Sequence, residues 1–465
     1  MILPQWLWAV CLTVFVAGRG AMGLQLKADD EDSIKEAAAT TAYNMMSQYS
    51  GNETGQVPGK LGGTWWEGGA MFMTLIQYWY WTGDDSYNGP VSQGMYWQKG
   101  NDDYFPSNYS NYLGNDDQVF WGLAAMTAAE LNYPEDEGEP SWLSLAQGVF
   151  NTQVPRWDTT ACGGGLRWQI YPYQEGYGTK NSVSNGGLFQ LAARLARYTN
   201  NETYSEWADK IWDWSSKSPL VQPDRWFVAD TTDLDTNCKN AGNLQWTYNY
   251  GMYLSGSAYM YNLTDGDGKW KHRVDGLLKS VEKTFFPKTH GSNILSEVAC
   301  EPNMKCDRNQ DCFKGFLAAW LTFMTTIAPY TSDRIIPKIQ ASAEAAAKQC
   351  SGGKSGSACG RRWYQPKWDG STSLESDMSA LSIMSSAMIA HRKTSDGGKG
   401  GNGPFTSDSG GKSKGDPHAG TGSTNDGSDD KLEPITTGDK AGAGILTAVF
   451  AGGWVGAVAW LLYGL

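Results

Sequence analysis

The chain has 465 residues, a formal net charge of -12 at pH 7 and 18% charged residues. An acidic chain without a basic stripe lacks the electrostatic footprint of a nucleic-acid-binding protein, which argues against a nucleic-acid partner. The 22 Trp and 23 Tyr residues favour a carbohydrate ligand instead, because flat aromatic rings stack on the C–H faces of sugars.

Residues 1–23 have the pattern of a secretory signal peptide. An apolar run over residues 7–17 is followed by small residues up to Gly23, and this suits cleavage before Leu24. We therefore expect an exported protein whose folded domain spans residues 24–392.

Apolar residues recur at helical spacing along most of this domain, in segments separated by Gly- and aromatic-rich loops. Ten to twelve helices are expected, over residues 29–48, 61–83, 114–130, 142–157, 181–198, 202–216, 246–261, 270–286, 311–326, 337–349 and 374–391. A loop is expected between Asp84 and Gly114, and a short β-hairpin over residues 226–235. Because the helices come in sequential pairs, we expect an all-α, closed ring of helical hairpins whose loops converge on a central cleft at one rim.

The segment Gly114–Glu130 places two adjacent carboxylates, Asp116 and Asp117, at the start of an apolar helix. Two Asp side chains held close in a partly dry site do not ionise together easily, so one is held as an acid and the other as a base or nucleophile. Sugar hydrolysis requires this division of roles. The structural alternative is that Asn115 is the N-cap, Gln118 completes a capping box and the carboxylates favour the positive end of the helix dipole.

Seven cysteines remain after removal of the signal peptide. They are Cys162, Cys238, Cys300, Cys306, Cys312, Cys350 and Cys359. In an exported chain with only four His and no C-x-x-C pair, this spacing predicts disulfides rather than a metal site, and we expect no cofactor. The odd number leaves one thiol unpaired, and the pairing stays open. Four N-x-S/T sequons predict glycosylation on exposed loops, at Asn52, Asn108, Asn201 and Asn262.

Residues 393–437 are rich in Gly, Ser, Asp and Lys and contain hardly an apolar residue, so we expect a disordered stalk. An uncharged apolar stretch then runs from Ile445 to the last residue, after small residues and a polar spacer. This arrangement is typical of a GPI-attachment signal over residues 438–465. The alternative is a tail-anchored transmembrane helix, since about twenty apolar residues span a bilayer. The lack of Lys or Arg after the stretch favours the lipid anchor.

Five motifs occur in one order along the domain. They are Trp65–Phe72 (WWEGGAMF), Asn115–Gln118 (NDDQ), Ser184–Leu195 (SNGGLFQLAARL), Gln245–Gly251 (QWTYNYG) and Phe313–Phe316 (FKGF). Together they resemble glycoside hydrolase family 76, the α-1,6-mannanases, and in particular the fungal cell-wall branch of that family. The resemblance implies an (α/α)6 barrel and a retaining double displacement on α-1,6-linked mannose. It also implies that Asp116 is the nucleophile and Asp117 the general acid/base.

Simple physical arguments agree with these implied roles. Retention requires carboxylates about 5 Å apart, a spacing that neighbouring side chains at a helix start can reach. Asp116, nearer the helix dipole, is expected to ionise more readily, and a desolvated Asp117 is expected to keep its proton.

The other matching residues are expected to bind the sugar. Stacking walls are expected from Trp66, Trp246 and Tyr248, and hydrogen bonds to hydroxyls from Asn185, Asp230 and Asn249. For each of these residues the structural alternative is a role in the core or at a helix cap.

The fungal branch implies transfer as well as hydrolysis: the mannose core of a GPI glycan is cut and the attached protein is passed to wall glucan. A retaining enzyme permits transfer, because a sugar hydroxyl can replace water at the glycosyl-enzyme intermediate. The expected partners are α-1,6-mannan or the GPI-core glycan, a β-glucan acceptor, and the membrane through a lipid anchor, at the outer face of the plasma membrane and in the cell wall. The alternatives are a non-catalytic mannan-binding wall protein on the same scaffold and a structural wall protein.

Overall fold

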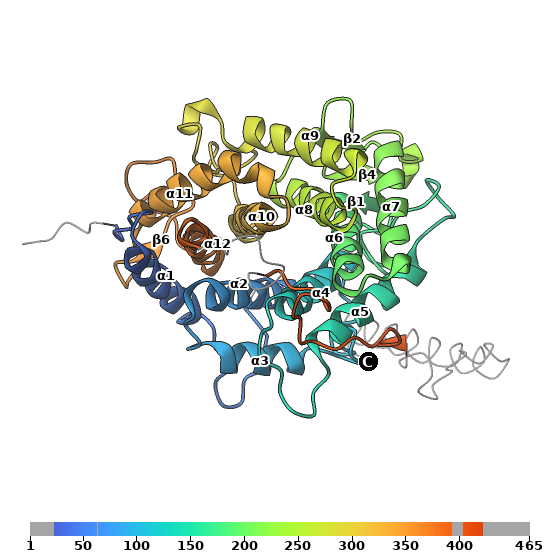
Figure 1. The fold of residues 1–465 in the computed structure, drawn as a ribbon, viewed down its shortest axis with the longest axis horizontal. Coiled ribbons are helices and arrows are strands. Elements are labelled where there is room, and N and C mark those ends of the chain that lie inside the picture. The colour runs from blue at the N-terminus through green and yellow to red at the C-terminus, as the bar shows by residue number, and fades with distance from the viewer. Residues whose placement is uncertain (1–22, 63, 393–402, 422–465) are drawn as a thin grey trace, which may run out of the picture.

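The computed structural model describes residues 23–62, 64–392 and 403–421. Within this part of the chain, twelve α-helices form two concentric rings (Figure 1). The inner ring consists of α2 (Trp66–Thr82), α4 (Asn115–Glu130), α6 (Ser182–Thr199), α8 (Thr247–Leu263), α10 (Arg308–Ile327) and α12 (Leu374–Ser386). The outer ring consists of α1 (Glu31–Met46), α3 (Asn88–Trp97), α5 (Trp142–Gln153), α7 (Glu202–Lys217), α9 (Gly268–Phe285) and α11 (Ser332–Gln349).

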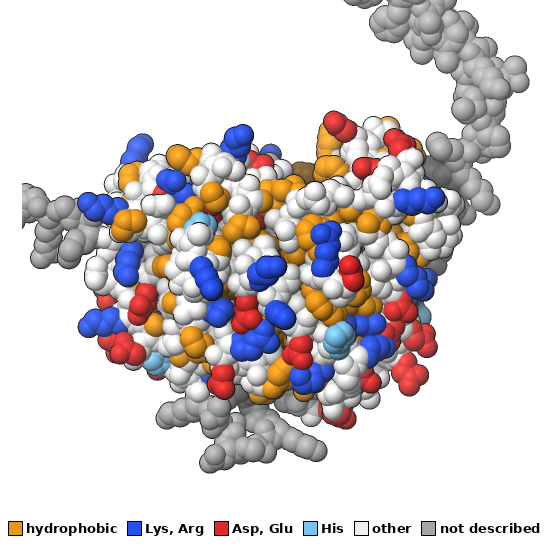
Figure 2. All heavy atoms as spheres, turned by 90° about the horizontal axis from the view of Figure 1, so that it is seen from above, with side chains coloured by type: hydrophobic (Ala, Val, Ile, Leu, Met, Phe, Trp, Pro, Cys, Tyr) orange, Lys and Arg blue, Asp and Glu red, His pale blue; other side chains and the backbone are white. Residues whose placement is uncertain are grey.

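Each inner helix packs on the next, and α12 packs on α2, so the ring is closed. The inner helices are buried on nearly all sides, whereas outer helices such as α7 and α9 bury one stripe and expose charged residues. Figure 2 looks onto the face that contains α9, where both Lys and Arg side chains and Asp and Glu side chains are exposed. The (α/α)6 barrel expected from the sequence is confirmed.

The strands are short and lie in the loops. Antiparallel pairs join β1 (Thr179–Asn181) with β4 (Thr231–Asp233), β2 (Val221–Gln222) with β3 (Phe227–Val228), and β5 (Cys350–Gly352) with β6 (Ala358–Cys359). Short 3₁₀ helices cover Val154–Arg156, Leu234–Thr236, Lys288–His290, Pro329–Thr331 and Ala387–His391.

Two local expectations are wrong. The hairpin predicted over residues 226–235 does not form, because β3 and β4 pair with other strands rather than with each other. The loop predicted before Gly114 contains α3. Its helical pattern is hard to recognise in the sequence because it includes Gly89, Pro90 and Gly94, which weaken helices. One of them, Gly94, is required by packing, since a Cβ there would overlap the ring of Phe72.

The cysteines form disulfides, as expected. The pairs are Cys162–Cys238, Cys300–Cys306 and Cys350–Cys359, and Cys312 is the buried free thiol among the described residues. No described helix is both long and apolar enough to cross a membrane. The predicted signal peptide and GPI-attachment signal lie outside the described residues, apart from Gly23.

Three of the four sequons fit glycosylation. Asn52, Asn108 and Asn201 are exposed. Asn262 differs, because it lies in the last turn of α8 rather than on a loop. Its side-chain amide donates to the carbonyl of Ile327 (2.8 Å) and accepts from Arg197 (2.7 Å). The expectation of an exposed loop site at Asn262 is therefore wrong.

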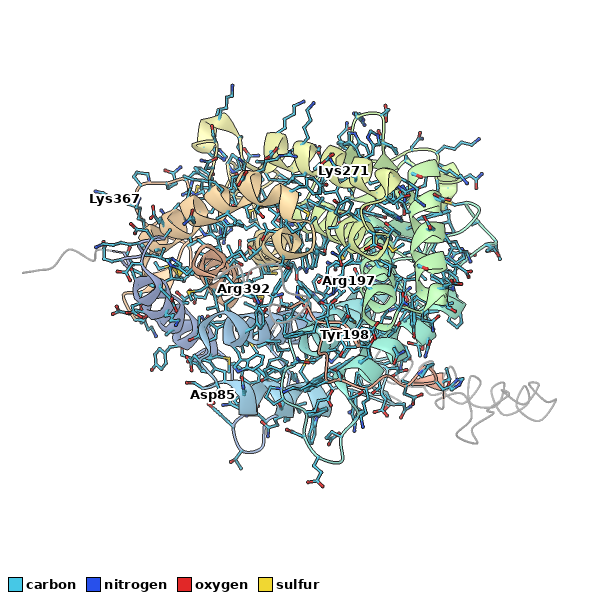
Figure 3. The ribbon with its side chains drawn as sticks, in the orientation of Figure 1. Asp85, Arg197, Tyr198, Lys271, Lys367 and Arg392 are labelled. Carbon is cyan, nitrogen blue, oxygen red and sulfur yellow. A yellow bond between two sulfur atoms is a disulfide. The ribbon has the colours of Figure 1, made fainter. Side chains whose placement is uncertain are left out.

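The expectation of a disordered stalk over residues 393–437 is wrong for residues 403–421, which pack on the helical domain. The Phe405 N–H donates to the last carbonyl of α4 (2.8 Å), and the Ser407 N–H donates to the carbonyl of Tyr198 near the end of α6 (3.0 Å). Tyr198 is labelled in Figure 3. We call residues 403–421 the strap.

The strap then follows α5. The Ser413 hydroxyl accepts from the Leu143 N–H (2.8 Å) and donates to Glu135 (2.6 Å), and the side-chain amide of Asn151 donates to two strap carbonyls (both 2.9 Å). A segment with so few apolar residues buries little apolar surface, which is why its composition predicted disorder. Hydrogen bonds to the ends of buried helices provide the ordering instead.

Replacing Ser413→Ala removes two partly buried hydrogen bonds between the strap and the barrel. We expect the free energy of unfolding to fall by about 1–2 kcal/mol in urea titrations. Asp408→Ala is the matched control, since that exposed strap side chain makes no hydrogen bond within the described residues. Equal stability of the two variants would show that the strap does not stabilise the domain.

Candidate active site

A cleft of about 260 Å³ opens at the end of the barrel where α2, α4, α6, α8 and α10 begin. Its lining residues are Thr64, Trp66, Asp116, Asp117, Phe120, Trp168, Gln169, Val183, Tyr248, Asn309 and Phe313. A larger groove of about 850 Å³ lies beside the Cys162–Cys238 disulfide, but none of its lining residues is an acid. The candidate chemistry is therefore in the smaller cleft, where the two predicted carboxylates meet aromatic side chains.

The carboxylates are placed by the first turn of α4. Gly114, not Asn115, is the N-cap, and Asp117 completes the capping box by accepting from the Gly114 N–H (2.7 Å). The predicted box of Asn115 and Gln118 is therefore wrong. The Asn115 side chain instead donates to the carbonyl of Arg167 (2.9 Å), which attaches the helix start to the neighbouring loop.

Gly114 also fixes how close the two carboxyl groups lie. A Cβ at this position would overlap Asp116 Oδ1 and would lie 3.4 Å from Asp117 Oδ2. These two oxygens are therefore less than about 6 Å apart, within the spacing of retaining glycosidases and below that of inverting ones. A glycine is needed here to leave space for the carboxyl group, since its φ of -90° is open to any residue.

Burial raises the pKa of both carboxyls. The pKa of Asp117 is raised to about 6, although the Gly114 N–H lowers it. The pKa of Asp116 is raised further, first by burial and then by the charge of Asp117. Above a pH of about 6 the ligand-free pair therefore holds one proton, with Asp117 the more readily ionised. The helix dipole predicts the opposite order, but burial and the charge of Asp117, which both raise the pKa of Asp116, outweigh it.

Aromatic side chains form the walls of the cleft. Tyr248 stacks on Phe313, with ring centroids 3.8 Å apart and an interplanar angle of 6°, and Trp66 packs on Phe120 at 4.7 Å. Two of the three predicted aromatics, Trp66 and Tyr248, therefore line the cleft. Trp246 is buried and does not line the cleft; its ring packs on that of Phe313 in a T-shaped arrangement, with centroids 5.8 Å apart.

The predicted polar residues are placed differently from one another. Asn185 is fully buried, and its side chain bonds the N–H and carbonyl of Leu166 and the carbonyl of Asn181. It therefore holds the loop that carries Trp168 and does not face a ligand. The amide of Asn249 donates to Asp230 (2.9 Å). None of the three predicted polar residues, Asn185, Asp230 and Asn249, is among the residues that line the cleft.

The loop that carries Trp168 and Gln169 was not recognised as part of the site, because it lacks any periodic pattern. Lys180 fixes the start of this loop. Its buried ammonium group donates a hydrogen bond to the carbonyl of Ala161 (2.9 Å) and lies 3.3 Å from Asp158 Oδ2. The sequence alone does not reveal that Lys180 is buried, so it could not identify this loop as part of the site.

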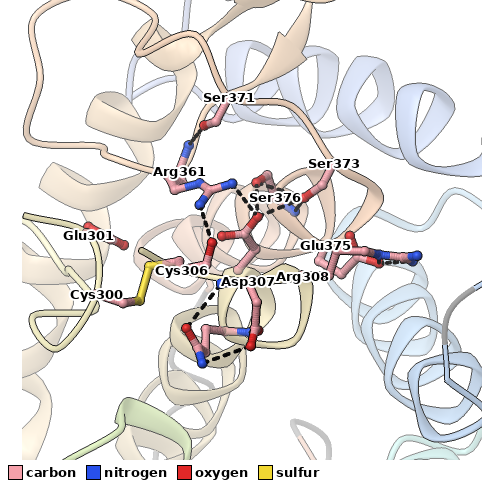
Figure 4. A network of polar contacts seen from close by, with 12 residues as sticks. Cys300, Glu301, Cys306, Asp307, Arg308, Arg361, Ser371, Ser373, Glu375 and Ser376 are labelled. Carbon is pink, nitrogen blue, oxygen red and sulfur yellow. Dashed lines mark hydrogen bonds and ion pairs between the residues drawn. A yellow bond between two sulfur atoms is a disulfide. The ribbon is translucent and has the colours of Figure 1, made fainter. Parts of the chain in front are cut away.

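A polar network joins the starts of α10 and α12 (Figure 4). Arg308 pairs with Glu375 and reaches Glu67 Oε2 on α2 at 3.4 Å, and Asp311 accepts from the Ser373 hydroxyl (3.1 Å). Burial and then the charge of Glu375 raise the pKa of Glu67 to about 7. A single arginine thus joins two buried carboxyl groups and ties three inner helices together beside the cleft. No group of three or more His, Cys, Asp or Glu side chains in the described ranges could hold a metal ion.

Residues 33–397, more than half of the chain, match the family described as glycosyl hydrolase family 76. The chain belongs to glycosyl hydrolase family 76. It is therefore a glycoside hydrolase, and this membership favours an enzyme over a non-catalytic or purely structural wall protein.

Curated relatives of this family 76 enzyme match it along almost its whole length. Mannan endo-1,6-alpha-mannosidase DCW1 of Saccharomyces cerevisiae is 41% identical over 459 residues, covering 97% of this chain and 98% of the relative. Mannan endo-1,6-alpha-mannosidase DFG5 of the same organism is 37% identical over 467 residues, covering 99% of each.

Solved structures share the fold. Dfg5 from Chaetomium thermophilum in complex with glucosamine is 42% identical, with a TM-score of 0.79, covering 85% of this chain and 97% of that one. An inactive variant of the α-1,6-mannanase GH76A of Salegentibacter sp. HEL1_6, in complex with α-1,6-mannotriose, is 19% identical, with a TM-score of 0.60, covering 77% of this chain and 99% of that one.

Because Glu297 is buried, we expect the stability of the protein to fall as the pH rises. Glu297 accepts from Thr247 at the start of α8, and burial raises its pKa from 4.5 to about 8. The folded state keeps a proton that the unfolded state releases between these values, so the free energy of unfolding falls as pH rises from about 5 to 8.

The Glu297→Gln variant keeps an acceptor for the Thr247 N–H but cannot titrate. We expect it to lessen this fall by about 1–3 kcal/mol in chemical unfolding measured across the pH range. Glu206→Gln, on the exposed face of α7, is the control and should follow the wild type. An unchanged pH slope in Glu297→Gln would contradict the assignment.

Proposed function

We propose that this enzyme is a retaining endo-α-1,6-mannosidase in which Asp116 is the nucleophile and Asp117 the general acid/base. The observation that carries the proposal is the separation of the two carboxyl groups, less than about 6 Å, because inversion needs a wider gap for water. The substrate class is supported by the names of relatives that match almost the whole chain, the mannan endo-1,6-alpha-mannosidases of yeast.

In the first step a carboxylate oxygen of Asp116 forms a bond to the anomeric carbon of mannose. The glycosidic bond breaks, and Asp117 gives its proton to the departing sugar oxygen. The shared proton must therefore lie on Asp117 when attack occurs. A bound sugar favours this arrangement, because the leaving oxygen accepts a hydrogen bond on one side and positive charge develops beside Asp116 on the other.

The aromatic walls support the same reaction. Tyr248 and Phe313 offer a stacked surface at the cleft, and Trp66 faces it from α2. Such walls exclude water and hold the apolar faces of a pyranose ring. Desolvation also keeps the carboxyl pair sharing one proton, which the two roles require.

In the second step an acceptor hydroxyl gives its proton to Asp117 while its oxygen attacks the anomeric carbon, and the ester bond to Asp116 breaks. The acceptor is water in hydrolysis and a sugar hydroxyl in transfer. We propose that the chain transfers GPI-core mannose to wall β-glucan at the outer face of the plasma membrane, held there by a lipid anchor attached near residue 437. Analysis of the products of a defined GPI-core glycan, with and without glucan, separates transfer from hydrolysis.

The variants Asp116→Asn and Asp117→Asn should each lower the turnover of an α-1,6-mannan oligosaccharide at least about 1,000-fold, since each removes one of the two chemical roles. Helical circular dichroism should be unchanged. Full activity of Asp116→Asn would exclude it as the nucleophile.

Gly114→Ala tests the placement of the pair without changing its chemistry. The added methyl group must displace the Asp116 carboxyl, and we expect turnover to fall about 10- to 100-fold, as for other small misplacements of reacting groups. Gly178→Ala is the matched control, because a Cβ there meets nothing within 4 Å. Similar turnover in both variants would contradict the geometric argument.

A further inference from the structure

The chain leaves the ring of helices at the end of the barrel opposite the cleft. Arg392 follows the last 3₁₀ helix, and its guanidinium carbon lies 5.0 Å from the ring centroid of Tyr80 and 5.1 Å from that of Trp81, in the last turn of α2 (Figure 3). The strap begins at the same place, since the Tyr80 hydroxyl donates to the carbonyl of Gly403 (3.3 Å). The inner helices all begin at the cleft end, so the last turn of α2 lies at the far end.

From there the strap runs along α5 toward the cleft. Ser413 accepts from the Leu143 N–H in the first turn of α5 (2.8 Å). Near the last turn of the same helix, Asn151 donates to the carbonyls of Pro417 and Ala419 (both 2.9 Å). Successive strap residues therefore follow α5 from its start to its end.

The end of the strap lies beside the first turn of α4, which carries the carboxyl pair. A Cβ on Gly420 would lie 3.0 Å from the Cβ of Asp103, and the carbonyl of Asp103 accepts from the Gln118 side chain (2.8 Å). Gln118 directly follows the pair in the sequence. The strap thus crosses the length of the barrel, about 24 Å for the 16 residues of α4. It moves the exit of the chain from the far end to the cleft end.

We propose that the strap orients the enzyme at the membrane, with the cleft end facing the lipid surface. This proposal rests on the lipid anchor near residue 437 and on the GPI-core glycan, both proposed above. About 16 residues separate the end of the strap from that anchor, and a random coil of this length has an average end-to-end distance of about 20–24 Å. The cleft end is therefore held within about one barrel length of the lipid, and the far end is held farther away.

This orientation suits a substrate that is itself attached to lipid. The glycan of a GPI lies at the membrane surface, because it is joined to the lipid head group. Without the strap, the chain would leave the barrel at Arg392, about 45 residues before the anchor, and the far end would face the membrane. Effective concentration falls roughly as the −3/2 power of tether length, so the shorter tether raises that of the cleft at the surface about fivefold.

The direct test measures energy transfer from a fluorophore on the full chain to acceptor-labelled lipids, after reconstitution of the anchored protein into phosphatidylcholine vesicles. The fluorophore is attached through Tyr112→Cys, at a residue 77% exposed on the loop before α4, or through Asp85→Cys, at an exposed residue after α2. The free thiol of Cys312 is buried and so is protected from the reagent. We expect about twofold higher transfer from position 112 than from position 85, because a barrel length of about 24 Å separates the two ends.

Releasing the strap from α5 should remove this difference. The Asn151→Ala/Ser413→Ala variant breaks the bonds to α5 and leaves the residues that line the cleft unchanged. We expect turnover of a GPI glycolipid in the same vesicles to fall about three- to fivefold, because the tether is longer and leaves from the far end. Turnover of a soluble α-1,6-mannan oligosaccharide should be unchanged, which also shows that the variant is folded. Asp408→Ala is the matched control.

Equal transfer from positions 112 and 85 in the wild type, or higher transfer from position 85, would overturn the orientation. Equal turnover of the vesicle-bound glycolipid in the double variant and in Asp408→Ala would overturn the role of the strap. If a phosphatidylinositol-specific phospholipase does not release the wild type from membranes, the lipid anchor is overturned and the orientation with it. Absence of turnover of the soluble oligosaccharide by the wild type would overturn the proposed activity, and the energy transfer would still decide the orientation.

Discussion

The structure depends on the confinement of two adjacent carboxyl groups at the start of one buried helix. Asp116 and Asp117 lie in a cleft whose low polarity makes two negative charges costly, so the pair shares one proton once the pH rises above about 6. A shared proton gives one carboxyl able to attack and one able to donate. The pair is held in place in three ways. Gly114 leaves space for the Asp116 carboxyl, its N–H donates to Asp117, and the neighbouring loop bonds the start of α4.

The barrel confines the two carboxyl groups because its inner helices all begin at one end, where the cleft lies, and finish at the other. At the far end, Glu130 of α4 pairs with the buried Arg194 of α6 at 2.7 Å, and the strap crosses the same end before following α5. That end buries charged groups, although Glu130 Oε1 and Arg194 Nη1 have no hydrogen-bond partner among the described residues. The cleft end is instead bordered by loops held by the buried Lys180, the Cys162–Cys238 disulfide and the hydrogen bond from Gln174 to the carbonyl of Leu113.

The sequence predicts the ring and the acid pair well, because both follow from local patterns. Paired helices with apolar periodicity and two adjacent aspartates at a helix start are visible without any long-range contact. The features that the sequence does not predict depend on contacts between residues that are distant in sequence. The bonds of Asn185 to Leu166, the strap bonds to α4 and α5, and the pairing of β1 with β4 are all of this kind. The proton order within the pair follows from burial and from the charge of Asp117 on Asp116, which local propensity does not reveal.

The most direct test of the central claim is the configuration of the first product. Proton NMR during the early turnover of an α-1,6-mannan oligosaccharide resolves the anomeric signals of the newly formed reducing end before mutarotation. Two carboxyl groups this close predict the α anomer, formed through a covalent intermediate. Initial release of the β anomer would mean direct attack by water and would contradict the account.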